Sequence, residues 1–363
     1  MEADIIVGLG YGDEGKGITT DYLCSQYQSS ETCVVRFSGG QQAGHTVMLG
    51  DKKHIHASFG SGTLRGIDSY FTEHTTVYPV SLINEFRILQ DLSLVPKLFI
   101  HPLAKITTPY DVWNNRECKT NILAGTCGMG VGKTMKRNEG PCKLHAIDLL
   151  NRDVLENKLE AIGKYYWEFR RDFNNIEFDK ELKRFYRAVA TMKTFVTVQG
   201  YEKLYNYHNL VFEGSQGILL DMDHGVFPHV TYANTTSKNA IEVCNFLNIG
   251  TPTVYYITRG YSTRHGKGPF EEKPIHLINT EEETCVENRW QREFKIAPID
   301  YDKLNYAIKL DQQIYSRFAR HCMVVTCIDQ IEPNSFKHDS INVMFEAIYE
   351  SHSPYSKDFK KIN

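Results

Sequence analysis

The feature that most constrains this chain is the glycine-rich segment Gly-Tyr-Gly-Asp-Glu-Gly-Lys-Gly at residues 10–17. A short apolar run at residues 4–7 precedes it and a helix-like run at residues 18–25 follows it, which suits a strand, a loop and a helix. The first turn of such a helix presents free backbone N–H groups that bind phosphate. The segment therefore predicts a phosphate-binding loop in an α/β protein.

Two nucleotide-binding patterns fit this segment, each with one mismatch. As a G-x-G-x-x-G dinucleotide fingerprint it lacks an acidic residue after the second strand, where Arg36 and Phe37 stand. As a G-x-x-x-x-G-K loop it has Gly17 where a magnesium-binding Ser or Thr is expected. Asp13 can bind a metal, take a proton, or do both. The structural alternative is a glycine turn in which Asp13 and Glu14 only favour the helix start.

The balance of charge limits the classes of partner. With 41 basic and 44 acidic residues and a net charge of −3, the chain has no overall field that would collect nucleic acid or an anionic membrane. No run approaches the roughly 18 to 20 apolar residues that span a bilayer, and the start lacks the basic residues of a secretory signal. We therefore expect a cytoplasmic protein whose nine cysteines are reduced.

The order of apolar runs predicts an α/β fold, with a mainly parallel central sheet covered by helices in a single domain of residues 1–363. We expect a helical insertion at about residues 151–207 and strands at residues 4–7, 33–37, 210–212, 254–257, 323–327 and 341–344. Residues 46–59 alternate around a Gly-Asp pair, which predicts a hairpin. We interpret His54 and His56, on one face of it, as ordinary half-buried strand histidines.

Further segments extend the pattern of the first loop. They are Arg-Phe-Ser-Gly-Gly-Gln-Gln-Ala-Gly-His-Thr at residues 36–46, Phe-Glu-Gly-Ser-Gln-Gly at 212–217, and the segments at 220–225, 228–231 and 261–270. Together with the loop they resemble, in order, the signatures of the adenylosuccinate synthetases. The resemblance runs from residue 5 to about residue 355 and is weakest at 151–207 and after 270. It implies one large α/β domain, a homodimer, and ligation of L-aspartate to the six-position of a purine nucleotide, driven by GTP hydrolysis.

The resemblance also implies a mechanism for making the purine oxygen a leaving group. Asp13 is expected to remove the N1 proton, so that O6 attacks the γ-phosphate and the amino group of aspartate then displaces the 6-phosphoryl group. His45 would stabilise the moving phosphoryl group, Lys16 would neutralise phosphate charge, and Gln216 would offer its amide to O6. Magnesium would be held by the carboxylate of Asp13 and the carbonyl of Gly44.

The donor nucleotide is expected to contact both the loop and a C-terminal segment. Asp329 can accept from guanine N1–H and N2–H, which adenine does not supply, so GTP is favoured over ATP. The expected donor-binding residues are Gly12, Asp13, Glu14, Gly15, Lys16, Gly17, Gly44, His45, Thr46, Asp329, Ser351 and Pro354.

The other two substrates have their own expected residues. Thr126 and Thr231 match positions that grip the acceptor phosphate in the family, and Arg137 is expected to complete this grip from the partner subunit. The full expected acceptor set is Asp13, Gln42, Thr126, Cys127, Arg137, Gln216, Leu220, Thr231 and His265. Arg289, Arg292 and Lys295 are expected to bind the carboxylates of aspartate, although a solvated charged face fits the same residues.

The chain is short, which resembles archaeal members and a phage branch that uses dGMP in place of IMP for a diaminopurine genome. Gln42, Cys127 and His265 differ from bacterial members on the acceptor side, and His265 is expected to lie against a sugar without a 2′-hydroxyl. We therefore expect dGMP as acceptor, with IMP as the alternative.

The Asp221, Asp223 and His224 group is interpreted as structural. A nicotinamide dehydrogenase and a GTP-gated binding module are the rival classes.

Overall fold

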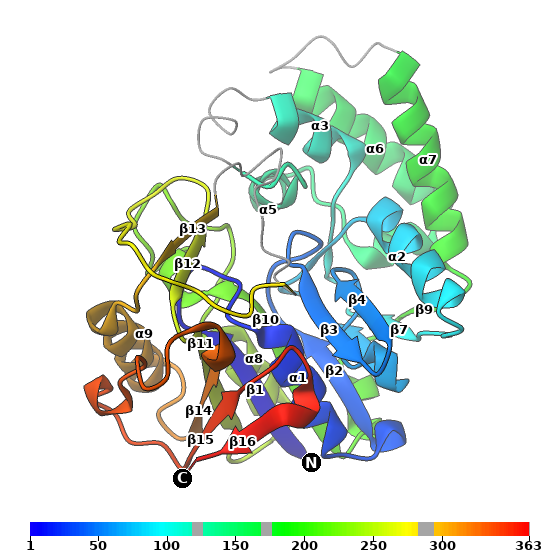
Figure 1. Ribbon diagram of the computed structural model, residues 1–363. Helices are drawn as coiled ribbons and strands as arrows, with labels where there is room; N and C mark the ends of the chain where they lie inside the picture. Colours follow the sequence, from blue (N-terminus) through cyan, green and yellow to red (C-terminus); the bar gives the residue numbers. More distant parts are fainter. Residues whose placement is uncertain (118–125, 168–175, 282–293, 363) are drawn as a thin grey trace.

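A ten-stranded sheet forms the centre of the protein in the computed structural model, which describes residues 1–117, 126–167, 176–281 and 294–362 (Figure 1). The strand order is β16-β15-β14-β11-β1-β10-β2-β5-β7-β9, and neighbouring strands are parallel except for β15 and β16. The strands are β1 (Glu2–Gly8), β2 (Thr32–Arg36), β5 (Asp68–Phe71), β7 (Leu98–Ile100), β9 (Val196–Val198), β10 (Asn209–Gly217), β11 (Thr253–Arg259), β14 (Arg320–Thr326), β15 (Ala347–Ser351) and β16 (Phe359–Lys361). The predicted α/β class with a mainly parallel sheet is confirmed.

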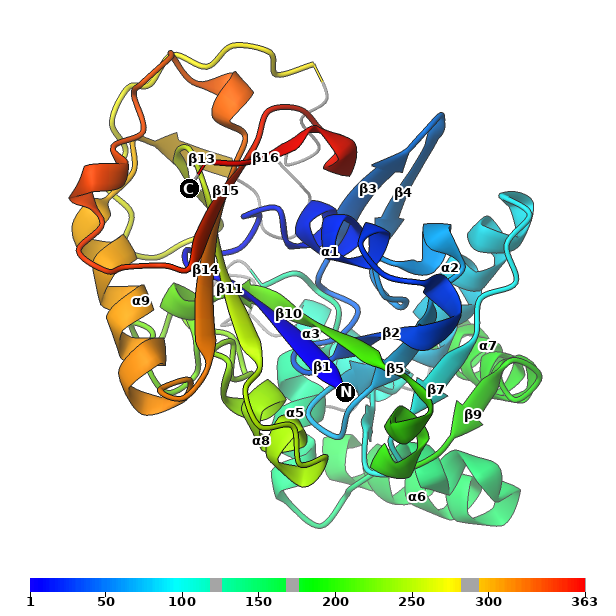
Figure 2. The same cartoon turned by 90° about the horizontal axis from the view of Figure 1, so that it is seen from below.

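Helices cover both faces of this sheet because its strands alternate buried residues between two cores. Ala3, Ile5 and Val7 of β1 pack in a core with α8 (Lys238–Phe246) and α9 (Tyr301–Ile314). Ile6 faces the opposite way and packs with Leu23 of α1 (Lys16–Ser25). Figure 2 shows α1 and α8 on opposite sides of the sheet. The central strand β1 is therefore buried on both faces, as expected for a parallel sheet.

A third core joins the β5 and β7 side of the sheet to a helical layer (Figure 1). The helices outside the two faces described above are α2 (Pro79–Asp91), α3 (Pro109–Glu117), α5 (Val131–Glu139), α6 (Arg152–Trp167) and α7 (Ile176–Met192). The predicted helical insertion thus contains α6 and α7, but it also returns to the sheet as β9. Figure 1 shows α3, α5, α6 and α7 on the side of the sheet away from the two chain ends.

Three small two-stranded sheets complete the described strands: β3 (His45–Leu49) with β4 (Lys52–His56), β6 (Thr76–Val77) with β8 (Lys105–Ile106), and β12 (Ser262–His265) with β13 (Phe294–Ala297). The β3–β4 pair is the predicted hairpin. The strand predicted at residues 341–344 is wrong, since these residues form a coil that leads to β15. Ile341 and Val343 pack against the main core, which explains why their sequence is apolar.

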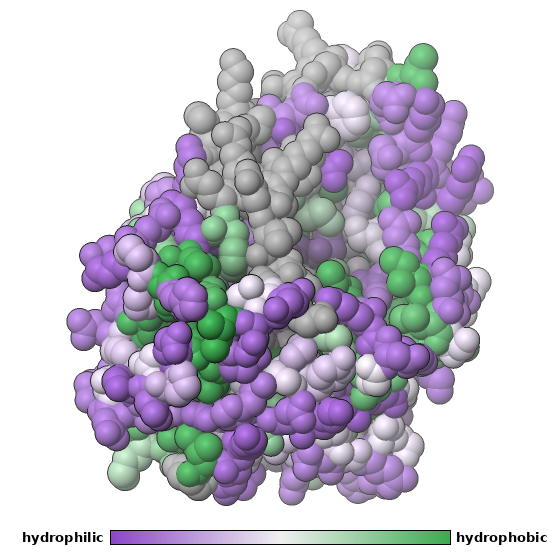
Figure 3. Space-filling view, in the orientation of Figure 1, coloured by the Kyte–Doolittle hydropathy of each residue, from purple (hydrophilic) through white to green (hydrophobic). Residues whose placement is uncertain are grey.

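The face of the molecule drawn in Figure 3 is mainly hydrophilic. On the face drawn in Figure 3, hydrophilic residues predominate among those described, and hydrophobic ones form separate patches. None of the helices in the described ranges combines the length and the apolar character that a bilayer crossing requires. The seven described cysteines form no disulfide with one another, and Cys118 and Cys285 lie outside the described residues.

Candidate functional site

The glycine-rich loop runs from the end of β1 to α1 and is held from both sides. Glu14 turns back into it, and its Oε1 accepts the backbone N–H groups of Gly10 at 3.0 Å and Gly12 at 2.8 Å. The Arg259 Nε–H donates to the Asp13 carbonyl oxygen at 2.5 Å, and the Thr326 hydroxyl donates to the Glu14 carbonyl at 2.9 Å. The loop therefore has a fixed shape set by the ends of β11 and β14.

Gly17 lies where α1 approaches β3 most closely. A Cβ atom at this position would lie 2.8 Å from the Cβ of His45, 3.1 Å from the carbonyl oxygen of Thr46 and 3.2 Å from the His45 carbonyl carbon. Two of these neighbours are backbone atoms, which have little room to move. The Ser or Thr of an ordinary phosphate loop is thus excluded here because the chain that carries His45 occupies its place.

Asp13 has a left-handed backbone conformation, with φ of 63°. Its carboxylate Oδ2 lies 3.2 Å from Nε2 of His265. Burial alone would raise the pKa of the Asp13 carboxyl. The hydrogen bond from His265 and the positive charges of Arg259 and Lys16 outweigh this effect and lower that pKa to about 2. Asp13 is therefore ionised at neutral pH, as both a metal ligand and a proton acceptor must be.

His45 is buried against a second carboxylate, which the sequence did not single out. Its Nδ1 lies 2.6 Å from Oε1 of Glu213 on β10. Burial lowers the pKa of the His45 imidazole, although the Glu213 charge acts in the opposite direction. Burial also acts to raise the pKa of Glu213, but the charges of His45 and Arg36 dominate and lower it to about 2. The Ser61 backbone N–H and hydroxyl also donate to Glu213, so this carboxylate is held in place.

These groups meet at a cavity of about 570 Å³ that is rich in positive charge. Asp13 is its single carboxylate among the described residues. The Lys and Arg residues that line the cavity are Lys16, Lys133, Lys136, Arg259, Arg264 and Lys267. Although the net charge of the chain is −3, its positively charged side chains gather at this concave surface. Such a surface suits ligands that carry several phosphate or carboxylate groups.

Most of the predicted site residues line this one cavity. They are Gly12, Asp13, Gly15, Lys16, Gly17, Gln42, Gly44, His45, Thr46, Thr126, Cys127, Gln216, Leu220, Thr231 and His265. The amide oxygen and nitrogen of Gln42 are buried and have no hydrogen-bond partner among the described residues. Gln216 has φ of 52°, so it shares the left-handed conformation of Asp13. Such strained residues often belong to functional sites.

The position predicted for Arg137 is wrong. This side chain is buried inside the chain, where Nε lies 2.9 Å from Asp111 Oδ1 and the other two nitrogens donate to the carbonyl oxygens of Cys142 and Ile106. It fastens α5 to α3 and does not face a second subunit. Lys133 and Lys136, three residues apart on the same helix, line the cavity instead.

The C-terminal residues predicted to bind the donor base, Asp329, Ser351 and Pro354, do not line this cavity. Thr326, at the end of β14, contacts the loop, and Asp329 follows three residues later in the short helix Ile328–Gln330. The positive charge of His352 acts on Asp329, which brings this helix near the turn after β15. Ser351 ends β15 and Pro354 belongs to that turn, and the neighbouring Tyr355 forms a β-bridge with Met48 of β3.

The aspartate-binding prediction falls largely on an undescribed segment. Arg289 and Arg292 lie outside the described residues. Lys295, on β13, forms an ion pair with Glu272 at 2.9 Å. It lies opposite Arg264 across the β12–β13 pair.

Two arginines of the cavity were assigned no role from sequence. Arg264 stacks on the ring of Tyr11, with its guanidinium carbon 4.3 Å from the ring centre, and lines the cavity. Arg259 ends β11 and holds the loop. Arg264 and Glu213 lie within the 261–270 and 212–217 signatures, so their sequence context was a usable signal, whereas Arg259 resembled an ordinary strand-end residue.

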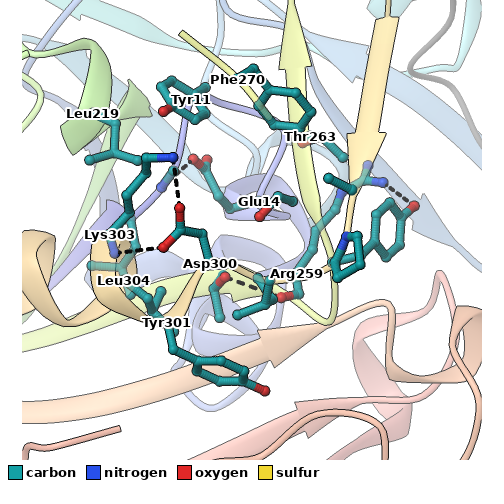
Figure 4. Close-up of a pocket in the computed structure, with 18 of the residues that line it drawn as sticks. Tyr11, Glu14, Leu219, Arg259, Thr263, Phe270, Asp300, Tyr301, Lys303 and Leu304 are labelled. Atoms are coloured by element: carbon teal, nitrogen blue, oxygen red, sulfur yellow. Dashed lines mark hydrogen bonds and ion pairs between the residues drawn. The ribbon is translucent and has the colours of Figure 1, made fainter. Parts of the chain in front are cut away.

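A second cavity of about 460 Å³ adjoins the first across the loop (Figure 4). Tyr11, Gly12 and Arg259 line both cavities. Figure 4 shows Glu14, Arg259 and Asp300 directed toward this space, and Lys303 forms an ion pair with Asp300 at 2.7 Å. The loop thus separates two adjoining cavities, and only the first combines Asp13, His45 and Gln216.

The fold and the site together define an α/β nucleotide-binding protein built around a modified phosphate loop. Comparison with known proteins gives the family. The family model of adenylosuccinate synthetase matches residues 5–314. The adenylosuccinate synthetase of Clostridium botulinum strain Alaska E43 is 33% identical over 296 residues, which cover 77% of this chain and 67% of the relative. The adenylosuccinate synthetase of Thermoplasma volcanium is 30% identical over 324 residues, which cover 85% of this chain and 72% of the relative.

Solved structures share the fold. The fully ligated adenylosuccinate synthetase of Plasmodium falciparum superposes with a TM-score of 0.72 at 20% identity, covering 99% of this chain and 87% of that one. The succinoaminodeoxyadenylate synthetase of cyanophage S-2L, bound to dGMP and dATP, superposes with a TM-score of 0.71 at 16% identity, covering 99% of this chain and 95% of that one. The chain belongs to the adenylosuccinate synthetase family and is a carbon–nitrogen ligase.

Proposed function

We propose that this ligase joins the amino group of L-aspartate to C6 of a 6-oxopurine nucleoside monophosphate, with dGMP as the preferred acceptor and GTP as the phosphate donor. The observation that carries the proposal is the convergence of Asp13, His45 and Gln216 on one cation-lined cavity. The product from dGMP is N6-succino-2-amino-2′-deoxyadenylate, and GDP and phosphate are released.

The reaction has two steps. In the first, Asp13 takes the N1 proton, O6 attacks the γ-phosphorus of GTP, and GDP leaves. In the second, the aspartate amino group attacks C6, the 6-phosphoryl group leaves as phosphate, and the amine loses its proton. Gln216 offers both a donor and an acceptor to the purine edge, so it can hold the base through the change from oxygen to nitrogen at C6.

His45 and Lys16 act on the transferring phosphoryl group. With Nδ1–H bonded to Glu213, a neutral His45 has Nε2 free only as an acceptor. The negative charge of a bound triphosphate favours protonation of His45, which then donates to the phosphate while Glu213 stabilises the imidazolium. Lys16, paired with Glu14 at 2.5 Å, adds positive charge at the start of α1.

The residues present fit a magnesium ion. Asp13, whose carboxyl is ionised, and Gly44 line the same cavity, and a carboxylate and a backbone carbonyl are oxygen ligands of the kind that Mg²⁺ prefers. When bound, the ion neutralises charge on the phosphates of the donor. The absence of a hydroxyl at Gly17 makes Asp13 the protein side chain best suited to this role.

Three cavity residues support dGMP as the acceptor. Gln42, Cys127 and His265 differ from the usual bacterial residues and line the same cavity. His265 contacts the Asp13 carboxylate, so it can influence both the sugar and the base that lie against Asp13. The cyanophage enzyme, which shares the fold, was solved with dGMP.

IMP remains the second candidate acceptor because the sequence relatives are adenylosuccinate synthetases of cellular organisms. Similarly, Asp329 favours GTP, whereas dATP in the cyanophage structure supports an adenine donor as the alternative. The family resemblance further supports a homodimer in which the partner chain completes the acceptor site.

The deciding experiment supplies purified protein with aspartate, Mg²⁺ and GTP or ATP, together with IMP, GMP or dGMP. We expect the highest kcat/KM with dGMP and GTP, followed spectrophotometrically as the succino product forms. Preference for IMP would establish the second candidate, and no product with any acceptor would overturn the ligase. A His265→Val variant should move the preference toward IMP if His265 selects against the 2′-hydroxyl.

A further inference from the structure

The β3–β4 hairpin and α2 carry a buried cluster of metal-ligating side chains, none of which lines either cavity described above. His54 and His56 of β4 and Glu85 of α2 each offer one ligand atom, and these atoms all lie within 4.8 Å of one another. Within the described ranges, this is the one group of three or more His, Cys, Asp or Glu side chains that meets such a criterion. The two histidines are i and i+2 on a strand, so they share a face.

His56 makes the cluster unusual. The side chain is fully buried, and neither of its ring nitrogens has a hydrogen-bond partner among the described residues. A buried polar group without a partner costs about 1 to 3 kcal/mol, so its retention requires an explanation. The prediction that these are ordinary half-buried histidines is therefore wrong about their environment.

We propose that His54, His56 and Glu85 bind one zinc ion. Two imidazoles and one carboxylate are a donor set that Zn²⁺ prefers, whereas Mg²⁺ prefers oxygen ligands alone.

The distances require only local adjustment. His54 Nε2 lies 3.3 Å and His56 Nδ1 lies 4.0 Å from Oε1 of Glu85. Ligand atoms around a tetrahedral zinc ion are about 3.4 Å apart, given zinc bonds of about 2.0 to 2.1 Å. Rotation of the rings about their side-chain torsions closes the remaining gap. The fourth position is left to water or another donor.

The surroundings orient the carboxylate of Glu85. The backbone N–H of Ser58 donates to Glu85 at 2.5 Å, and that of Ala57 donates at 3.1 and 3.2 Å. Such bonds fix a ligating carboxylate in direction. The positive charges of His54, His45 and Arg36 act on His56, and the negative charge of Glu213 acts in the opposite sense. Within the proposed donor set, the carboxylate of Glu85 is the one negatively charged group.

A zinc ion here would link the hairpin to α2. His56 lies directly opposite His45 in the β3–β4 pairing. The proposed metal would therefore stabilise the strand pair that carries His45, without contacting the nucleotides. This inference does not depend on the identity of the acceptor.

The test uses the full-length protein, stripped of metal with a chelator, kept free of nucleotide and supplied with Zn²⁺ in excess Mg²⁺. We expect one zinc per chain after desalting, measured by elemental analysis, and an increase in Tm on zinc addition. Co²⁺ in its place should give the visible spectrum of a tetrahedral site without thiolate charge transfer.

The matched variants are His54→Gln and Glu85→Gln, with His276→Gln as control because His276 is an exposed histidine paired with one carboxylate. We expect loss of zinc and of the Tm increase in the first two, checked for folding by circular dichroism, and retention in the control. Absence of stoichiometric zinc in the unmodified protein, undiminished zinc in both folded variants, or a thiolate spectrum would each overturn the proposal.

Discussion

Two residues proposed to touch the purine, Asp13 and Gln216, hold left-handed backbone conformations that side chains other than glycine seldom adopt. Sequence pattern and family resemblance were enough to select both, because each lies inside a short signature. Their conformations, the Asp13–His265 contact and the Glu213 partner of His45 depend on chain segments far apart in sequence. These contacts were therefore not predictable from the local pattern.

Asp13→Asn isolates the charge of the proposed base, since Asn tolerates the left-handed backbone at this position. We expect kcat to fall about 10²- to 10⁴-fold, the range typical of a lost general base. Steady-state kinetics measures this, and calorimetric titration with GTP reports whether the donor still binds. Retention of near-normal kcat by a folded Asp13→Asn protein would exclude Asp13 as the base.

Glu213→Gln tests the buried pair with His45 through pH. The pKa of Glu213 is lowered from 4.5 to about 2, so its contribution to the free energy of unfolding is present above pH 4.5. This contribution, roughly 3 kcal/mol by linkage, is lost as the pH falls from about 4.5 toward 2. Urea unfolding of both proteins should show a difference that is largest near neutrality and shrinks in acid. A difference independent of pH would contradict this assignment.

The elements around the site were predicted unevenly. The strand, loop and helix of the N-terminus and the β3–β4 hairpin followed from local periodicity and turn residues. The strand predicted at residues 341–344 failed because coil residues that cap a core can be as apolar as a strand. Arg137 was misplaced because an arginine near a glycine-rich turn gives no sign that its partner, Asp111, lies on another helix.

Gly17→Ser tests the close approach of α1 to β3. Although serine would restore the hydroxyl of an ordinary phosphate loop, its Cβ would lie 2.8 Å from the Cβ of His45 and in tight contact with backbone atoms of His45 and Thr46. We expect a loss of about 1 to 3 kcal/mol in stability, as for overpacking, together with a reduced kcat because His45 is displaced. Thermal denaturation and turnover measure the two effects. Unchanged stability with improved Mg²⁺ affinity would contradict the steric explanation.

At the scale of the whole molecule, positive charge is concentrated at one site although the net charge of the chain is negative. Six Lys and Arg side chains line the main cavity of a chain whose net charge is −3. Sequence totals gave the net charge, but only the folded arrangement places Lys133 and Lys136 of α5 in the same cavity as the loop. The composition therefore excluded a general polyanion-binding surface and left a local anion site undetected.

We expect nucleotide binding to weaken as salt screens this cluster. The screening length falls from about 30 Å at 0.01 M salt to about 3 Å at 1 M. The Kd for the acceptor monophosphate, measured by titration across that range, should rise with salt. Lys133→Ala with Lys136→Ala should flatten this dependence, and Lys97→Ala, outside the cavity lining, should leave it unchanged. An equal salt dependence in all three proteins would show that these lysines do not act on the ligand.

The sheet order has a consequence for synthesis on the ribosome. β1 is made first, but its two neighbours in the sheet, β10 and β11, begin only at Asn209 and Thr253. At about 5 to 20 residues per second, the two neighbouring strands are completed roughly 10 to 50 s after the N-terminal strand has been synthesised. Until Arg259 emerges, the Asp13 carbonyl lacks the donor that holds it in the finished protein. A nascent chain should therefore gain the ability to bind a nucleotide only after Arg259 has been translated, at about 70% of the 363 residues. Until then β1 is an apolar strand without its partners, to which chaperones can bind.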